Sequence, residues 1–341
     1  MAKKVLVTGG AGYIGSHTVV ELVRSGYEPL ILDDYRNSEV SVIGRLEKII
    51  GKVPEVIVGD VCDEDFVHEI FKNHELSGVI HFAAYKAVGE SVEKPLKYYS
   101  NNISGLVSIL KPICERGNIP FVFSSSCTVY GEPEGLKEVT EQTPRSIPAS
   151  PYGYTKWLGE QIVNDAFKAN HELKLMNLRY FNPIGAHPSG LIGELPIGKP
   201  NNLLPFITQT AAGIHDELVI FGNNYPTVDG TCIRDYIHVV DLAEAHVKAI
   251  DYLLSQDEGC CETVNIGTGT GTSVLELVNT FKEENDIDLK YSFGPERPGD
   301  VIEIFANVDY AKSLLGWGSK KDTRDAVRDA WNWEKSIRNI E

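Results

Sequence analysis

The sequence lacks three features: long apolar runs, a surplus of positive charge and cysteines at metal-binding spacing. No apolar run approaches the roughly 18 residues that a membrane span needs, so we expect no transmembrane helix. Lysine and arginine total 32 against 48 aspartates and glutamates, which gives a formal net charge of −16. This balance argues against nucleic acids and anionic membranes as partners, because both require clustered positive charge. A small anionic ligand held by a few local arginines is compatible with it.

The cysteines indicate a reducing environment. The chain has 6, and they form no CxxC pair. In a chain of this length they are typical of free cytosolic thiols, so we predict a cytoplasmic protein without a structural metal. The first ten residues run directly into a strand-like segment, and we expect no signal peptide there.

The pattern of apolar residues predicts an α/β fold. Near-continuous apolar runs alternate with helical patterns in the first half of the 341-residue chain, as in a parallel sheet covered on both faces. We therefore predict a doubly wound, Rossmann-like parallel sheet in a nucleotide-binding domain, residues 1–181. Residues 182–341 would form a smaller mixed α/β substrate lobe that sends a segment back to the first. The strands are expected at 3–10, 29–34, 55–61, 78–84, 120–126 and 173–181.

Two local features qualify this prediction. Residues 182–202 are dense in glycine and proline, which indicates a loop running over the mouth of a site. Pro112 falls within an otherwise helical pattern, and we expect a kink or an early break of the helix there.

A glycine-rich loop follows the first expected strand. TGGAGYIG contains both Gly10-x-Gly12-x-x-Gly15 and Gly9-x-x-Gly12-x-x-Gly15. Such glycines permit a tight turn and let the backbone approach a pyrophosphate at a helix N-terminus. The motif alone is weak, but here it follows a strand and opens a helix, and it therefore predicts dinucleotide binding.

An acidic residue ends the second expected strand. Asp33 lies where a carboxylate binds the adenosine ribose in dinucleotide-binding folds, and it would repel the 2′-phosphate of NADP. NAD is therefore the expected cofactor. Arg36 is a mild counter-argument, since an arginine can accept that phosphate. The alternative is that Asp33 only caps a turn.

Ser126, Tyr152 and Lys156 form a candidate catalytic group. Tyr152 and Lys156 are four residues apart in SPYGYTKWLGE, so both would lie on one face of a helix. A neighbouring ammonium favours the phenolate, and we expect it to lower the pKa of Tyr152 toward neutrality, as a general base requires. Ser126, at the end of the fifth expected strand, would bind the substrate hydroxyl. An exposed amphipathic turn and a serine-rich turn are the alternatives.

Several motifs together resemble the UDP-galactose 4-epimerases, which are extended short-chain dehydrogenases/reductases. The resemblance covers nearly the whole chain and rests on TGGAGYIGSH, HFAAYKAVGES, YYSNN, SSSCTVYG, SPYGYTK, LRYFNPIGAHPSG, PNNLLPF, RDYIHVVDLA and RPGD. It implies an NAD-dependent isomerase of galactose metabolism with tightly bound NAD, and a UDP-hexose whose C4 is oxidised and then reduced on the opposite face. It also implies a homodimer formed through the helix that bears Tyr152 and Lys156.

The resemblance also implies which residues bind the cofactor and the substrate. The residues expected to bind NAD are Gly9, Gly12, Tyr13, Ile14, Gly15, Asp33, Asn37, Ser38, Asp60, Val61, Phe82, Ala83, Lys86, Asn101, Tyr152, Lys156 and Phe181. Those expected to bind the UDP-sugar are Ser126, Asn182, Asn202, Leu203, Val219, Phe221, Arg234, Arg297, Asp300 and Ile304.

Some functions stay open at this point. Ile304 matches a position that limits the space beside the sugar's 2-substituent, and isoleucine, intermediate in size, leaves UDP-N-acetylhexosamines open as substrates. A nucleotide-sugar 4,6-dehydratase would need an Asp-Glu pair where this chain has Cys127 and Thr128. A non-catalytic NAD sensor, or a dehydrogenase with a freely exchanging cofactor, would share the fold.

Overall fold

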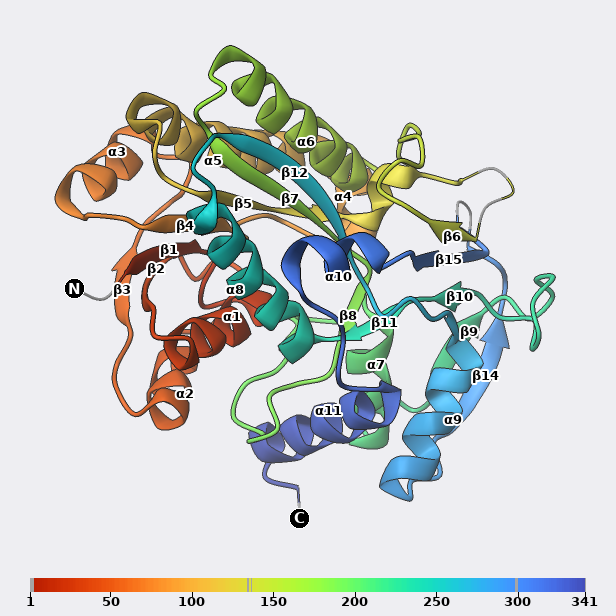
Figure 1. Ribbon diagram of the computed structural model, residues 1–341. Coiled ribbons are helices and arrows are strands. Elements are labelled where there is room, and N and C mark those ends of the chain that lie inside the picture. The colour runs from red at the N-terminus through yellow and green to blue at the C-terminus, as the bar shows by residue number, and fades with distance from the viewer. Residues whose placement is uncertain (1–2, 134, 136, 298–299, 341) are drawn as a thin grey trace.

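A seven-stranded parallel sheet forms the centre of the computed structural model, which describes residues 3–133, 135, 137–297 and 300–340 (Figure 1). The strand order is β12-β7-β5-β4-β1-β2-β3. From β1 the chain builds outward through β2 and β3 on one side, and then returns to place β4 on the other side of β1. Such a switch point leaves a crevice at the carboxyl ends of β1 and β4. The strands are β1 (Lys4–Thr8), β2 (Glu28–Asp33), β3 (Glu55–Val58), β4 (Gly78–His81), β5 (Phe121–Ser126), β7 (Lys174–Tyr180) and β12 (Cys260–Ile266).

Helices cover both faces of the sheet. Successive residues of a strand point to opposite faces, and in the buried strands the residues on each face are apolar. On β5, Val122 packs in one core cluster, whereas Phe121 and Phe123 pack in the other. The first cluster lies under α1 (Tyr13–Arg24), α2 (Ser41–Ile50), α8 (Val239–Ser255) and α10 (Asp309–Leu315). The second lies under α3 (Glu64–Asn73), α5 (Pro95–Arg116) and α6 (Pro151–Ala169), with α4 (Val88–Glu93) beside α5 and α6.

The second half of the chain builds a smaller lobe and also extends the sheet. β12 adds the outermost strand beside β7, and α8 packs against α1 (Figure 1). The lobe has a core of its own, between α7, α9 and α11. Its elements are β8 (Asn182–Ile184), α7 (Leu203–Ala211), β9 (Leu218–Phe221), β10 (Ile233–Arg234), β11 (Tyr236–His238), β13 (Thr272–Ser273), α9 (Val274–Asn285), β14 (Tyr291–Gly294), β15 (Glu303–Ala306) and α11 (Thr323–Arg338). One strand from the first half of the chain, β6 (Glu138–Val139), joins them by pairing with β15.

Two local predictions were wrong in part. The early break, one of the two alternatives at Pro112, does not occur, since α5 continues to Arg116. Pro112 removes only the backbone bond to Ser108, while the buried Ile109 and Ile113 hold this turn against the sheet. The segment after residue 182 is not loop from its start, because β8 pairs in parallel with β11 before the chain becomes irregular.

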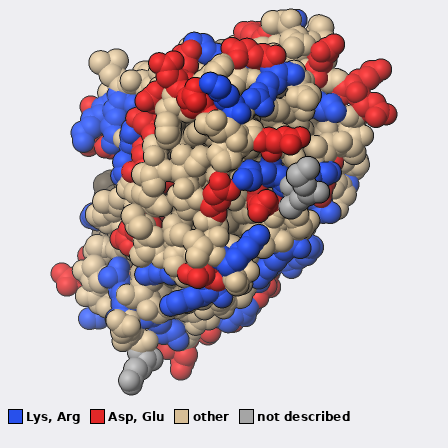
Figure 2. Space-filling model, turned by 90° about the vertical axis from the view of Figure 1, so that its left-hand side faces the viewer, with Lys and Arg blue, Asp and Glu red and all other residues tan. Residues whose placement is uncertain are grey.

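The surface mixes charges of both signs. Figure 2, which views the face nearest the N-terminus and β3, shows lysines and arginines interspersed with acidic side chains. Ion pairs join different elements of the fold, such as Lys4 with Glu55 at 2.6 Å and Lys111 with Glu64 at 2.5 Å. Within the described ranges, no helix has both the length and the apolar character required to cross a membrane.

Candidate active site

The glycine loop connects β1 to α1 and is shaped by close backbone contacts. Gly9 has a φ of +71°, and the Gly12 amide donates to its carbonyl at 3.0 Å. A Cβ on Gly15 would lie 2.2 Å from that same oxygen, so only glycine permits the turn. α1 begins directly after Gly12, and its N-terminus faces the carboxyl edge of the sheet. This cradle fits a dinucleotide pyrophosphate.

The Asp33 carboxylate orders the loops on which an adenosine ribose would lie. Its oxygens accept hydrogen bonds from the Ala11 amide at 3.0 Å and from the Tyr35 amide and Ser38 hydroxyl at 2.9 Å each. Arg36 is held by acidic neighbours, and its guanidinium contacts Asp34 and Asp60 at 2.5 Å each. An arginine engaged in this way is poorly placed to receive a 2′-phosphate, which favours NAD.

The other predicted cofactor residues all lie near the carboxyl ends of parallel strands. Asn37 and Ser38 follow β2, Asp60 and Val61 follow β3, Phe82, Ala83 and Lys86 follow β4, Asn101 lies on α5, Phe181 follows β7, and Tyr13 and Ile14 open α1. Tyr13 donates to the Gly185 carbonyl at 2.7 Å, which ties α1 to the loop after β8.

Ser126, Tyr152 and Lys156 come together at this edge of the sheet. Ser126 is the last residue of β5, and Tyr152 and Lys156 lie in the first two turns of α6. α6 starts here because Ser150 caps it, its hydroxyl accepting from the Gly153 amide at 3.2 Å, with Pro151 at the first position.

The prediction that the protein's own side chains lower the pKa of Tyr152 was wrong. Burial outweighs the Ser126 hydrogen bond and raises the pKa of Tyr152 to about 12. Lys156 Nζ lies 6.0 Å from the Tyr152 ring centroid and donates to the Ser124 carbonyl at 2.5 Å. Burial lowers the pKa of Lys156 to about 7. Additional positive charge near Tyr152 is therefore required for a phenolate.

The run of three serines has three separate partners. The Ser124 hydroxyl lies 3.4 Å from Lys156 Nζ, and Ser126 interacts with Tyr152. Between them, the Ser125 hydroxyl points to the other face of β5 and donates to Glu160 at 2.5 Å. Sequence reasoning chose only Ser126, although the period of two along a strand separates Ser125 from its neighbours.

The predicted substrate residues other than Ser126 lie on the second lobe. Arg234 on β10 pairs in register with Ile304 on β15, and its guanidinium is 3.8 Å from the Asp300 carboxylate. Arg297 stacks over the Phe221 ring at 4.0 Å. Of the remaining candidates, Asn182 begins β8, Asn202 and Leu203 open α7, and Val219 lies on β9.

Glu194 is a site residue that sequence reasoning missed. Its Oε1 accepts from Lys86 Nζ and from Asn202 Nδ2, each at 2.6 Å. One carboxylate thus joins a residue predicted to bind the cofactor to one predicted to bind the substrate. Nothing in the surrounding GELPI sequence signals this role. Across the described residues, no cluster of three or more His, Cys, Asp or Glu is arranged to hold a metal ion.

Comparison with known proteins agrees with this arrangement. The family model described as GDP-mannose 4,6 dehydratase matches residues 6–330. The UDP-glucose 4-epimerase of Bacillus subtilis is 48% identical over 332 residues, which cover 97% of each chain. The chain belongs to the UDP-glucose 4-epimerase family of extended short-chain dehydrogenases/reductases.

Solved structures of this family match throughout the chain. The UDP-glucose-4-epimerase of Stenotrophomonas maltophila, with bound NAD and formylated UDP-arabinopyranose, is 43% identical with a TM-score of 0.95, covering 99% of this chain and 100% of that one. The Bifidobacterium longum enzyme, in complex with NAD+ and UDP, is 42% identical with a TM-score of 0.94 and the same coverage. The family is one of NAD-dependent isomerases, which confirms the predicted fold, family and cofactor.

Proposed function

We propose that this protein interconverts UDP-galactose and UDP-glucose on a tightly bound NAD. The observation that supports the proposal most is the meeting of Ser126, Tyr152 and Lys156 beside the Gly9–Gly15 loop and Asp33. Tyr152 would take the proton of the sugar's C4 hydroxyl, bound NAD would supply the acceptor for the hydride that must leave C4 to form the ketone, and the same hydride would return to the opposite face of C4. No net oxidation results.

The chain's own residues position and deprotonate the sugar. Ser126 hydrogen-bonds the 4-hydroxyl, Tyr152 removes its proton, and Lys156 binds the cofactor ribose. NAD, when bound, supplies the hydride acceptor and a positive nicotinamide ring. That charge acts in the direction that Tyr152 requires, because the protein alone holds the pKa of the phenol at about 12.

Arg234 and Arg297 are the proposed ligands of the UDP diphosphate. Arginine forms paired hydrogen bonds with phosphate, and both residues lie on the substrate lobe of an otherwise acidic chain. Arg234 is anchored by a hydrogen bond to the Ile233 carbonyl at 2.9 Å, and Arg297 by its stacking on Phe221. Asn182, Asn202, Leu203, Val219 and Asp300 complete the proposed contacts.

The matching family model has a dehydratase in its description, but the site argues against dehydration. A 4,6-dehydratase needs an acid and a base directly after the catalytic hydroxyl, where this chain has Cys127 and Thr128. Burial raises the pKa of the Cys127 thiol to about 12, so it stays protonated. Threonine does not titrate in this range. Epimerisation is therefore favoured over elimination of water.

We also propose slower activity on UDP-N-acetylhexosamines. Ile304 is 4% exposed and packs with Val129 and Phe181 beside the candidate site. Its side chain is smaller than that of tyrosine, so it would take up less of the space beside the sugar's 2-substituent.

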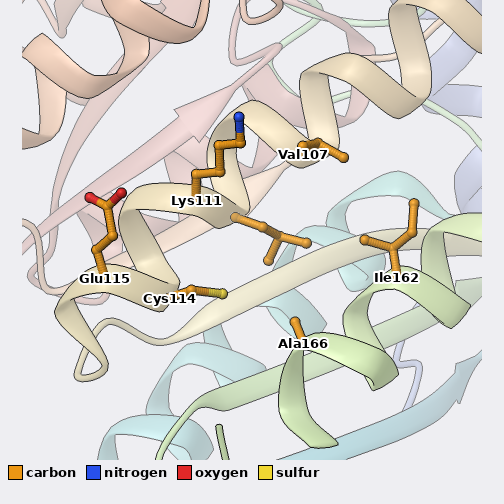
Figure 3. A pocket seen from close by; sticks show the side chains of 7 residues that line it. Val107, Lys111, Cys114, Glu115, Ile162 and Ala166 are labelled. Atoms are coloured by element: carbon orange, nitrogen blue, oxygen red, sulfur yellow. The ribbon is translucent and has the colours of Figure 1, made fainter. Parts of the chain in front are cut away.

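A homodimer through α5 and α6 is part of the proposal. An open groove of about 340 Å³ lies between these helices and is lined mostly by apolar side chains. In Figure 3, Cys114, Ile162 and Ala166 point toward the space between the helices, whereas the charged ends of Lys111 and Glu115 point away. A matching pair of helices from a second copy would fill it. Sedimentation that shows only monomer at micromolar concentration would contradict the dimer.

We place the protein in the cytoplasm. All six cysteines are free thiols, and burial raises the pKa of Cys261 to about 12, which keeps that thiol unreactive. Free thiols are typical of a reducing compartment.

The test of the proposed function is an NMR assay of purified protein with UDP-galactose and no added nucleotide. Growth of UDP-glucose to a stable mixture, without net NADH, is expected. Accumulation of NADH only after NAD is added would indicate a dehydrogenase instead. A 4-keto-6-deoxy product would indicate a dehydratase.

A further inference from the structure

The Glu194 carboxylate has no part in the mechanism above. Its side chain is 10% exposed, and it lies in the irregular segment between β8 and α7. Its Oε1 accepts from Lys86 Nζ and from Asn202 Nδ2, each at 2.6 Å. A carboxylate that is largely removed from water requires such partners, because its charge is costly to bury unpaired. Both partners are predicted to touch a ligand.

The backbone of Glu194 is fixed by α11. The Trp333 indole, which is 3% exposed, donates from Nε1 to the Glu194 carbonyl at 3.0 Å. At the preceding residue, a Cβ on Gly193 would lie 2.4 Å from the same indole ring, so only glycine lets the chain pass this close to it. The Arg45 guanidinium of α2 lies 4.9 Å from the centroid of this ring, which gives a cation–π contact. The carboxylate therefore belongs to a segment that is held by a side chain contacted from both lobes.

On the cofactor side, Glu194 determines where the Lys86 ammonium lies. The Lys86 side chain is 45% exposed, and without a partner it would be free to adopt many rotamers. Paired with Glu194, its Nζ lies 5.5 Å from the centroid of the Tyr13 ring, at the start of α1. The ion pair thus holds the ammonium beside a second predicted NAD contact, directly after the glycine loop.

On the substrate side, Glu194 orients the Asn202 amide. Asn202 is the residue before α7 and is exposed, so packing alone does not fix its side chain. A carboxylate can only accept hydrogen bonds, and the amide therefore turns its nitrogen toward Glu194 and its Oδ1 away from it. Of the two orientations that the amide could take, Glu194 selects one before a nucleotide sugar binds.

We propose that Glu194 is a positioning residue for both ligands of the site. One carboxylate oxygen holds Lys86 for the cofactor by charge and Asn202 for the UDP-sugar by a hydrogen bond, and α11 holds the backbone that bears the carboxylate. Glu194 acts on each ligand only through these two side chains. The inference rests on the proposed binding of NAD and a UDP-sugar, and it adds a residue on which both binding sites depend.

Two variants of the holoenzyme separate the two contacts. Glu194→Ala removes both, so the release of bound NAD should become about tenfold faster and the Kd of UDP should rise about fivefold. Glu194→Gln keeps an oxygen at the position of Oε1 but loses the charge. It should release NAD about threefold faster and keep the Kd of UDP within about twofold, because a neutral oxygen still accepts from Asn202 but no longer pairs with an ammonium.

Both quantities are measured without turnover. Gel filtration followed by an assay of free NAD gives the rate of release, and calorimetry gives the Kd of UDP. A loss of structure alone would not divide the two ligands in the way expected of Glu194→Gln. That variant also keeps the shape of the side chain, so it decides the question if Glu194→Ala does not fold.

Double variants test whether Glu194 acts through its two partners. In a Lys86→Met background, Glu194→Ala should no longer change the rate of NAD release, and in an Asn202→Ala background it should no longer change the Kd of UDP. Effects that persist in full in both backgrounds would overturn the inference.

Glu244→Ala is the matched control. Glu244 also pairs with a lysine, Lys320, at 2.5 Å, and neither residue is predicted to touch a ligand. This variant should keep the wild-type rate of NAD release and the wild-type Kd of UDP.

Two further results would contradict the inference. Wild-type values for both ligands in Glu194→Ala and Glu194→Gln would show that neither partner needs the carboxylate. Slower release of NAD from either variant would show that Glu194 competes with the cofactor for Lys86. A wild-type protein that binds NAD and UDP but does not epimerise would contradict the proposed function alone, and the variants would still decide the role of Glu194.

Discussion

Arg179 holds Glu160 through two hydrogen bonds of 2.8 Å, one to each carboxylate oxygen, between β7 and α6. The two side chains are 5% and 1% exposed. Glu160 lies one turn after Lys156, so this ion pair fixes the part of α6 that bears the catalytic groups.

Breaking this ion pair from one side should destabilise the protein strongly. Glu160→Ala leaves the Arg179 guanidinium buried with no carboxylate, and we expect a loss of roughly 3–5 kcal/mol in the free energy of unfolding. Urea denaturation measures it. The double variant Glu160→Leu/Arg179→Met should lose less free energy of unfolding than the sum of the losses in Glu160→Leu and Arg179→Met. Losses that add exactly would contradict a coupled pair.

Removing the phenol should nearly abolish epimerisation. Tyr152→Phe is expected to lower kcat by about 10³-fold, the range for loss of a general base. Ser126→Ala, which removes a hydrogen bond to the substrate and to the phenol, should lower it about tenfold to a hundredfold. NMR rates test both, and UDP affinity by calorimetry should stay at the wild-type value. A Tyr152→Phe variant with more than a tenth of wild-type activity would exclude Tyr152 as the base.

The buried Lys156 should make the stability of the protein depend on pH. Its folded pKa of about 7 lies below its ordinary value of 10.5, so between these values the unfolded chain binds more protons than the folded one. Stability should therefore rise with pH from 7 to 10.5 because of this group, by at most about 1.4 kcal/mol per pH unit. Urea denaturation at pH 7 and pH 9.5 measures the rise. The free energy of unfolding of Lys156→Met should rise less than that of the wild type, and equal slopes would contradict the lowered pKa of Lys156.

Asp33 should determine the choice between NAD and NADP. Asp33→Ser is expected to weaken NAD binding about tenfold and to reduce the discrimination against NADP, because the carboxylate no longer repels a 2′-phosphate. Calorimetry with both dinucleotides tests this. Glu39→Gln is the matched control, since Glu39 is an acid close in sequence whose carboxylate accepts from the Ser41 hydroxyl at 3.0 Å. If both changes alter the affinities for NAD and NADP equally, the selectivity depends on the overall negative charge of this region and not on Asp33.

The size of residue 304 should decide activity on N-acetylated substrates. Ile304→Tyr is expected to abolish turnover of UDP-N-acetylgalactosamine, because the larger ring occupies the space beside the sugar's 2-substituent. The variant should retain most of its turnover of UDP-galactose. The ratio of kcat/KM for the two substrates measures it. An unchanged ratio would place Ile304 away from the sugar.

The sheet and its edge were predictable because they depend on local patterns. Six apolar runs became β1 to β5 and β7, since buried parallel strands read as continuous apolar segments. The glycine loop and Asp33 follow from their spacing along one strand–turn–helix unit. The pairing of β12 with β7 was harder to locate, because residues 260–266 are far from residues 174–180 in sequence.

The environment of the site could not be predicted from spacing. A separation of four residues places Tyr152 and Lys156 on one helical face, but it does not show that Lys156 turns to the Ser124 carbonyl. Burial, which sets the pKa of Tyr152, depends on elements from both halves of the chain. Glu194 likewise acquires its partners Lys86 and Asn202 only through the tertiary fold.

The serine run of β5 has a consequence for how this site tolerates change. Because Ser124, Ser125 and Ser126 alternate in direction, deleting one residue upstream in the strand would leave a serine at most of these positions but would exchange the partners of all three. Lys156 and Glu160 would each meet the serine of the next position, whereas Tyr152 would face the thiol of Cys127 in place of the Ser126 hydroxyl. A shift of β5 by one residue would therefore act on the site mainly through the partner of the phenol.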